Sequence, residues 1–303
     1  MVPEFRGAAL IAAALTVAAC SEAPPPDSPA ASALAAPASD AAEAPLAADG
    51  PALYVFDCGR IRLPTVVDFG LEDAQTDVRE LFVPCYLIRH ADGDLLWDAG
   101  LPPVYAADGQ WVDDDTGAGH RLDAPISAQL ETVGLAPADI EYVAFSHFHY
   151  DHVGDANAFA ASTLLIQRPE AEAAFGDDPG TAFFYPEFYA ALADAPTVTL
   201  DGDHDVFGDG TVRIISAPGH TPGHQVLLVD LAETGKVLLS GDLWHFAASR
   251  GLRAVPTFNA DRDRTLASMD RIEALLESEG ATLWLQHSLA FHEGLEWAPA
   301  AYR

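Results

Sequence analysis

Four side chains that bind transition metals crowd into six consecutive residues of this 303-residue chain, and they constrain its fold more than any other feature. They directly follow an apolar segment, residues 140–146, that is typical of a buried strand: His147, His149, Asp151 and His152. Alternate side chains of an extended segment face the same way, so His147 and His149 should address one point. The turn that follows should direct Asp151 and His152 to a neighbouring point. The motif predicts two adjacent metal positions at the end of a strand.

Strand-like and helix-like segments alternate along the rest of the chain. Strands are expected over residues 53–56, 83–90, 94–98, 140–146, 163–167, near 198, and over 212–217, 225–231, 237–240 and 281–286. Helices are expected over 126–133 and 261–279, with a helical insert over 169–192 and an irregular loop over 101–124. This order predicts two sheets packed face to face with helices on the outside.

With these residues the chain resembles the metallo-β-lactamase superfamily, whose His-x-His-x-Asp-His pattern is followed by a distant His, a bridging Asp and a last His. The later elements match His220 in Ala-Pro-Gly-His-Thr-Pro-Gly-His, Asp242 in Ser-Gly-Asp, and His287 after the last expected strand. The resemblance spans residues 53–288. It implies an α/β fold in which two mixed β-sheets flanked by helices form a four-layer αβ/βα sandwich.

The resemblance also implies a ligand set for two divalent transition-metal ions, with zinc expected. One metal would be bound by His147, His149 and His220, the other by Asp151, His152 and His287, and Asp242 would bridge them. His224 is expected to support the ligands rather than to bind metal. Four further histidines are expected to be ordinary surface residues: His90, His120, His204 and His292.

Within the superfamily the chain is most similar to the N-acyl-homoserine lactonases, through residues 83–88, 95–100 and 220–225 and the stretch after Asp242. The implied reaction opens the ester ring of a neutral lactone by attack of a hydroxide that bridges the two metals, with Asp151, or a water beside it, as proton donor. Many of these lactonases carry a tyrosine three residues after the bridging aspartate, where this chain has His245. Two roles stay open for His245: donation to the developing oxyanion, or packing against Trp244.

Aromatic residues of the insert have two open interpretations. They would either form an apolar wall for an acyl chain, opposite the loop that carries Trp111, or simply anchor the insert. The residues are Phe183, Phe184, Tyr185, Phe188 and Tyr189.

Charge narrows the choice of partner and substrate. The net charge is −31, from 46 acidic against 15 basic residues, so no nucleic-acid partner is expected and anionic thioesters are disfavoured. True β-lactamases usually lack an equivalent of Asp242, which disfavours β-lactams. The alternatives that remain are a metallo-hydrolase of another ester, thioester or β-lactam, and a non-catalytic metal-binding lipoprotein.

Residues 1–20 resemble a lipoprotein-type signal peptide, because Arg6, an apolar stretch and Val17-Ala18-Ala19 precede Cys20. Cys20 would then carry a lipid anchor to the membrane; the alternative is an ordinary secretory signal cleaved near Ala19. Residues 21–50 are rich in Ala and Pro and are expected to form a flexible tether to a hydrolase domain over 51–303. The protein is expected to be exported, periplasmic or anchored to the outer membrane.

Cys58 and Cys85 could pair in such a compartment or remain buried thiols.

Overall fold

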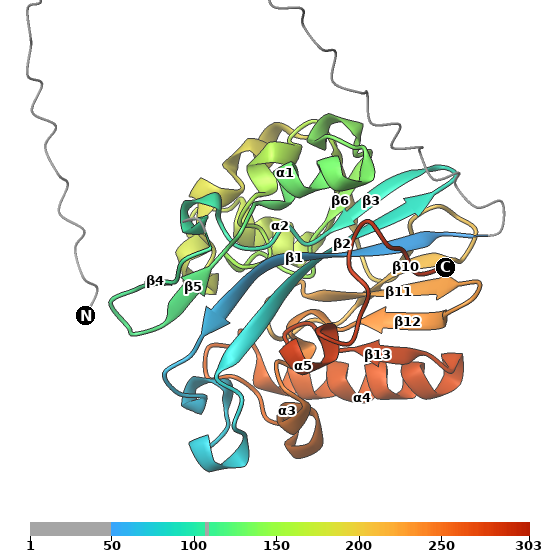
Figure 1. Ribbon diagram of the computed structural model, residues 1–303. Coiled ribbons are helices and arrows are strands. Elements are labelled where there is room, and N and C mark those ends of the chain that lie inside the picture. Colours follow the sequence, from blue (N-terminus) through green and yellow to red (C-terminus); the bar gives the residue numbers. More distant parts are fainter. Residues whose placement is uncertain (1–49, 107–108) are drawn as a thin grey trace, which may run out of the picture. The chain divides into compact units, whose positions relative to one another are not determined.

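The computed structural model describes residues 50–106 and 109–303, which build two β-sheets covered by helices (Figure 1). The larger sheet has, in spatial order, β4 (Val112–Asp113), β5 (Gly119–Arg121), β1 (Ala52–Arg62), β2 (Glu80–His90), β3 (Gly93–Trp97), β6 (Tyr142–Ala144), β7 (Thr163–Gln167) and β8 (Thr197–Leu200). The smaller sheet has β13 (Thr282–Trp284), β12 (Gly235–Leu239), β11 (Gln225–Leu231), β10 (Val212–Ser216) and β9 (His204–Asp205). The helices are α1 (Ile126–Gln129), α2 (Arg168–Ala174), α3 (Ala247–Leu252), α4 (Arg262–Glu279) and α5 (Leu289–His292).

Side chains that alternate between the two faces of a strand explain why the two sheets pack face to face. In β1, Leu53 and Val55 belong to the core between the sheets, whereas Tyr54 and Phe56 belong to the core on the other face of the larger sheet. Both faces are therefore apolar, and each must be covered. The core between the sheets joins residues of β2 and β3 to residues of β11 and β12: Tyr86, Ile88, Leu95, Leu227, Val229 and Leu239.

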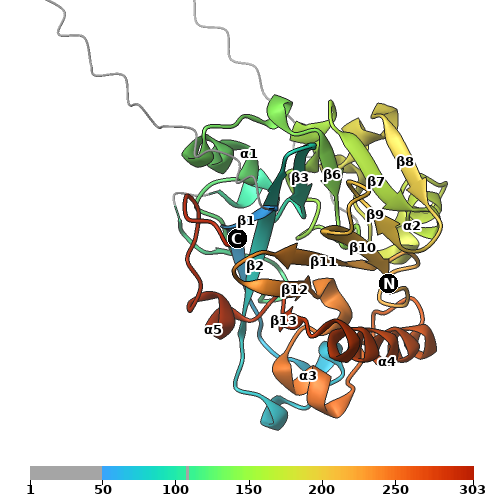
Figure 2. The same cartoon turned by 90° about the vertical axis from the view of Figure 1, so that its right-hand side faces the viewer.

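Helices cover the two outer faces and complete four layers (Figure 2). α1 and α2 lie over the larger sheet, where Ile126 and Ala174 join its outer core. α4 lies over the smaller sheet and buries Met269, Ile272 and Leu276. The helix begins at Asp261, whose side chain accepts a hydrogen bond from the N–H of Arg264, and ends at Gly280. The αβ/βα sandwich expected from the sequence is confirmed.

Two stretches differ from the sequence prediction. The segment 101–124 is not wholly irregular, because β5 pairs with β1 and extends the larger sheet. The insert 169–192 is not continuous helix: α2 is followed by single 3-10 turns that begin at Pro179, Pro186 and Ala190. Proline cannot continue a preceding helix, so the chain starts a new turn at each of the two prolines.

A disulfide bond joins Cys58 and Cys85 across β1 and β2, which answers the question that the sequence left open. The register of this strand pair shifts between Asp57 and Arg60, and Pro84 lies opposite Asp57 at the shift. Proline has no N–H to donate to a neighbouring strand, so it is tolerated where a bulge already interrupts the ladder. The bulge and the disulfide therefore occupy one irregular point of the sheet.

The prediction that four histidines are surface residues was wrong for three of them. His90, His120 and His292 are buried, and only His204 is partly exposed. Each buried ring has a hydrogen-bond partner distant in the sequence: Asp209, Tyr150 and Tyr86, respectively. A buried imidazole needs such a partner, and the sequence gives no sign of it.

Acid should destabilise the protein through His292. Its Nδ1 donates to the carbonyl of Ser288 and its Nε2 accepts from the hydroxyl of Tyr86, and burial lowers its pKa from 6.5 to about 4. The folded pKa lies below the unfolded one, so this contribution to stability is complete above pH 6.5 and is lost as the pH falls through 4. Relative to His292→Gln, the wild-type free energy of unfolding should drop by up to about 3 kcal/mol between pH 7 and pH 4. Denaturant titration of both proteins at each pH measures this; equal pH slopes would contradict it.

The predicted signal segment, residues 1–20, and nearly all of the predicted tether, residues 21–50, lie outside the described residues. Among the residues that the structure does describe, no helix is both long and apolar enough to cross a membrane.

Candidate metal centre

Four loops at one edge of the sandwich bring the predicted ligands together. The motif follows β6, and His220 lies in the turn between β10 and β11. Asp242 lies in η10, a single 3-10 turn (Gly241–Leu243) after β12, and His287 follows β13. Because β12 and β13 are parallel, the residues that follow them emerge at the same edge.

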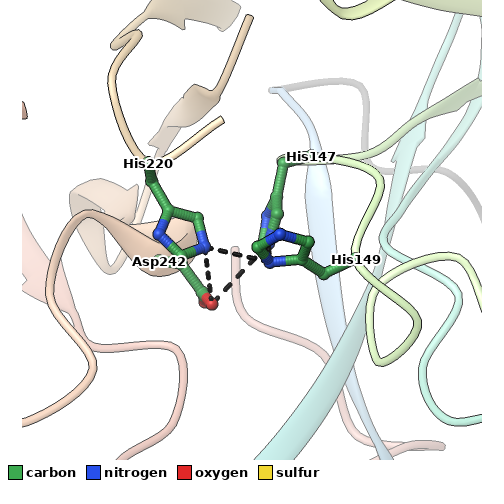
Figure 3. Close-up of side chains that lie close together, drawn as sticks. All are labelled: His147, His149, His220 and Asp242. Atoms are coloured by element: carbon green, nitrogen blue, oxygen red, sulfur yellow. Dashed lines mark hydrogen bonds and ion pairs between the residues drawn. The ribbon is translucent and has the colours of Figure 1, made fainter. Parts of the chain in front are cut away.

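His147, His149 and His220 direct ring nitrogens at one point next to Asp242 (Figure 3). The Nε2 of His147 lies 2.8 Å from the Nδ1 of His149, and the Nε2 of His220 lies 3.1 Å from that same Nδ1. A neutral imidazole ring carries only one N–H, so neutral rings cannot form a hydrogen bond in each of these close contacts. A cation can accept a lone pair from each of the ring nitrogens. These three histidines form the first ligand set.

Asp151, His152 and His287 form a second ligand set beside the first. The Oδ2 of Asp151 lies 3.6 Å from the Nε2 of His152 and 3.7 Å from the Nε2 of His287. All three side chains are buried or nearly so. The structure thus divides the motif into the two groups expected from the sequence.

Asp242 lies between the sets and offers one oxygen to each. Its Oδ2 is 3.7 Å from the Nε2 of His147 and 3.4 Å from the Nε2 of His220. Its Oδ1 is 3.3 Å from the Nε2 of His152 and 2.8 Å from the Nε2 of His287. A carboxylate placed in this way can bridge two cations.

Hydrogen bonds on the far side of three rings fix which nitrogen faces the centre. His220 donates from Nδ1 to the side-chain oxygen of Asn259, at 2.8 Å. His152 donates from Nδ1 to Asp98, at 2.9 Å, and His287 from Nδ1 to the carbonyl of Phe82, at 2.7 Å. A neutral ring that donates from Nδ1 keeps a bare lone pair on Nε2, the form that binds metal.

Buried polar atoms that lack a hydrogen-bond partner show whether a metal fits here. The Nε2 atoms of His152 and His287 and the Oδ1 of Asp242 are buried without a hydrogen-bond partner. The 2.8 Å between His287 and Asp242 is short enough for a hydrogen bond but is not aligned for one. Burial also lowers the pKa of His147 and His149, which keeps both rings neutral. Buried atoms left in this state fit bound divalent metal ions.

His224 and Gly241 hold Asp242 in its bridging position. The N–H of Asp242 donates to the Nε2 of His224, whose Nδ1 lies 3.0 Å from the carbonyl oxygen of Ala217. Gly241 has φ 47°, and a Cβ there would lie 2.7 Å from the Nε2 of His224. The close approach of Asp242 to His224 therefore requires glycine at 241.

Asp98 orders the second set and was not recognised from the sequence as a functional residue. Its side chain is fully buried and accepts hydrogen bonds from His152, from the N–H of Ser146 and from the side-chain amide of Gln286. Gln286 directly precedes His287. The sequence held one sign of this role: Asp98 is a carboxylate at the end of an expected strand, in Trp97-Asp98-Ala99-Gly100.

A cavity of about 510 Å³ opens onto the two ligand sets. Its polar floor includes Asp151, Asp242 and His245. Its other lining residues are mostly apolar and aromatic and include Ile61, Leu63, Phe69, Leu81, Phe183, Tyr185 and Phe258. An apolar cavity with a few convergent polar groups is typical of a small-molecule site.

The aromatic residues of the insert divide between the two roles considered for them. Phe183 and Tyr185 line the cavity, whereas Phe184 and Tyr189 are buried in the core and anchor the insert. Trp111 does not line the cavity; its ring lies under the guanidinium of Arg62, at 4.6 Å. The sequence could not show this, because the contact depends on the pairing of β5 with β1.

His245 lies at the floor of the cavity, with its Nε2 2.9 Å from the Oδ2 of Asp242. Its ring contacts Phe69 edge to face at 4.9 Å and stacks on His287 at 5.7 Å. Trp244 is buried on the other side, in the core under α4. The structure therefore brings His245 to the ligand sets rather than to Trp244.

Comparison with known proteins agrees with this geometry. The family model described as the metallo-beta-lactamase superfamily matches residues 78–283. The N-acyl homoserine lactonase AttM of Azorhizobium caulinodans is 33% identical over an alignment of 263 residues that covers 82% of this chain and 98% of that protein. The N-acyl homoserine lactonase AiiA of Bacillus thuringiensis subsp. kurstaki is 28% identical, over 78% of this chain and 93% of that protein.

Among solved structures, an N-acyl homoserine lactone hydrolase with the product N-hexanoyl-L-homoserine bound at its catalytic metal centre superposes with a TM-score of 0.72. The two chains are 25% identical, and the match covers 84% of this chain and 99% of that one. The family model matches more than half of this chain, and the relative at 33% identity is matched over 82% of it. The chain therefore belongs to the metallo-β-lactamase superfamily and, within it, to the family of the N-acyl homoserine lactonases.

Proposed function

We propose that this metal-dependent hydrolase opens the ester ring of N-acyl-homoserine lactones, with two Zn²⁺ ions bound by the ligand sets described above. The observation that carries the proposal is Asp242, whose two oxygens face two separate ligand sets beneath an apolar cavity. Family membership supports the same substrate class, because the relatives at 33% and 28% identity are lactonases.

Metals bound in this arrangement supply Lewis acidity and an activated water. The chain itself contributes two groups to the reaction. Burial lowers the pKa of His245, so its ring is neutral and carries one N–H. In the structure its Nε2 faces the Oδ2 of Asp242 at 2.9 Å, and the N–H can transfer from this carboxylate to the carbonyl oxygen as negative charge develops there. Asp151 lines the same cavity and can accept the proton that the attacking water loses and pass it to the ring oxygen that leaves.

The cavity suits an uncharged lactone with an apolar tail. Phe69, Phe183 and Phe258 offer aromatic surface to an acyl chain, and among the described residues that line the cavity none is Arg or Lys. Asp68, which belongs to neither ligand set, also lines it and disfavours an anionic substrate. These features favour a neutral lactone over an anionic thioester such as S-lactoylglutathione.

A substrate panel tests this proposal. Metal-replete protein should contain close to two transition-metal ions per chain by elemental analysis, because the two sets provide separate positions. Its kcat/KM should be at least about 10²-fold higher for acyl-homoserine lactones than for aryl esters, β-lactams or S-lactoylglutathione, a preference worth about 2.7 kcal/mol. A higher value for one of the other substrates would reassign the activity within the same superfamily.

We also propose that the protein is exported and tethered to the membrane through a lipid on Cys20. The segment that ends at Cys20 has the order of a lipoprotein signal. The Cys58–Cys85 disulfide supports the same location, because disulfides persist in oxidising compartments outside the cytoplasm.

Expression of the full-length chain in a bacterium should place it in the membrane fraction. Cys20→Ala should abolish lipid attachment and shift the protein out of that fraction, whereas Ser39→Ala, a similarly small change in the predicted tether, should leave it there. Fractionation with immunoblotting and mass spectrometry of the mature N-terminus measures both. Cytosolic protein that retains Met1 would contradict export altogether.

A further inference from the structure

We propose that Glu170 is a positioning residue that joins the two loops of the first ligand set, and that it thereby sets the affinity of one of the two metal positions. This inference rests on the proposed metal binding, although it does not depend on the identity of the substrate. Glu170 lies outside the ligand sets and does not line the cavity above them.

Glu170 sits in the first turn of α2, directly after β7, and only 2% of its surface is exposed. Its location places a carboxylate between the motif loop and the turn that carries His220. In the part of the chain that the structure describes, no Arg, Lys or His forms an ion pair with it. Burial raises the pKa of Glu170 to about 7, although three hydrogen bonds act in the opposite direction.

The three donors come from the two loops of the first set. The N–H of Phe148, between His147 and His149, donates to Oε1 at 3.0 Å. The hydroxyl of Thr221, next to His220, donates to the same oxygen at 2.9 Å. The N–H of Gly223 donates to Oε2 at 2.7 Å. A single side chain thus fixes both loops whose histidines converge in Figure 3.

The contact between the second loop and α2 is too close for a larger residue. A Cβ at Gly223 would lie 2.6 Å from the backbone nitrogen of Glu170 and 2.7 Å from its Cβ. Gly223 therefore lets the His220 turn lie directly against the helix. This close fit transmits the position of Glu170 to His220 without direct contact between the two side chains.

The second ligand set is held by different groups. Asp98 accepts from His152 and from Gln286, and the carbonyl of Phe82 accepts from His287. Loss of the Glu170 bonds should therefore affect the two metal positions unequally. A residue that merely stabilises the fold would weaken both or neither.

Glu170→Gln tests this asymmetry. The glutamine oxygen can still accept from Phe148 and Thr221, but its NH₂ would face the N–H of Gly223, two donors with no acceptor between them. One metal should then dissociate about 10- to 100-fold more readily in competition with a chelator, a typical effect of losing a group that orients ligands. Glu172→Gln, an exposed change in the same helix, should behave as wild type.

Double variants identify the affected position. Adding Glu170→Gln to His220→Ala, which already lacks a ligand of the first set, should change metal content little. Adding it to His287→Ala should bring metal content close to zero under the same chelator. Equal loss in both backgrounds, or wild-type metal retention by Glu170→Gln, would overturn the proposal.

Thr221→Val provides a milder variant in case Glu170→Gln does not fold. It removes one donor and keeps the shape of the side chain, so it should weaken metal binding at the same position several-fold.

Because the readout is metal content, the outcome is independent of lactone hydrolysis. Two bound metals without lactonase activity would refute the proposed substrate and leave this inference standing, whereas wild-type protein that binds only one metal would refute the inference itself.

Discussion

Asp242→Asn is expected to lose at least one metal under mild chelation and to hydrolyse lactones about 10³-fold or more slowly, because bridging stabilisation of several kcal/mol disappears. In the wild-type protein each carboxylate oxygen faces one ligand set, at 3.4 Å from His220 and 2.8 Å from His287. An amide keeps the size of the side chain but removes its charge and one acceptor. Elemental analysis and homoserine-lactone hydrolysis, measured on the same preparation, provide the test.

Asp230→Asn is a suitable control for this variant. Asp230 is a partly exposed aspartate on β11, and it should tolerate the same change with normal metal content and activity. An Asp242→Asn enzyme with both metals and full activity would refute the binuclear account. Loss of metal without loss of activity would refute the role of the metals in catalysis.

His245→Ala is expected to lower turnover by about 10²- to 10³-fold with unchanged metal content, as for removal of an oxyanion donor. The Nε2 of His245 lies 2.9 Å from the Oδ2 of Asp242 and the ring lines the cavity, so it is close enough to reach a substrate carbonyl. His245→Tyr, which introduces the phenol found in many related lactonases, should stay within about 10-fold of wild type because it restores a donor.

The two variants also separate the alternatives for His245. If the ring only packed against its neighbours, alanine and tyrosine would both lower stability and leave turnover of the folded enzyme nearly unchanged. If His245 bound a metal directly, alanine would reduce the metal content along with activity. Steady-state kinetics and elemental analysis of His245→Ala distinguish these outcomes.

Local patterns explain why much of the fold could be predicted from the sequence. The strand at residues 163–167 was expected with the same bounds as β7, because a short β-branched and apolar run was followed directly by a helix start. The long helix at α4 was marked by its apolar stripe and by Gly280. The metal-binding residues were recognisable because the motif packs several ligands into one short loop.

Features that depend on distant partners could not be predicted. β4, β5 and β9 have only two or three residues each and become strands only by pairing with neighbours already in place. His292 resembled a surface histidine, yet Tyr86, which is 206 residues away, accommodates it in the core. Glu170 lies in the expected helical insert, and its three donors come from loops that are distant in the sequence, so no local pattern marks it.

Titration of metal-free protein with Zn²⁺ during an N-acyl-homoserine lactone assay tests the central claim most directly. The two ligand sets with their shared carboxylate predict that activity rises until two equivalents have been added and then remains constant. Lactone opening that is already maximal without metal, or fully loaded protein that opens no acyl-homoserine lactone, would contradict the account.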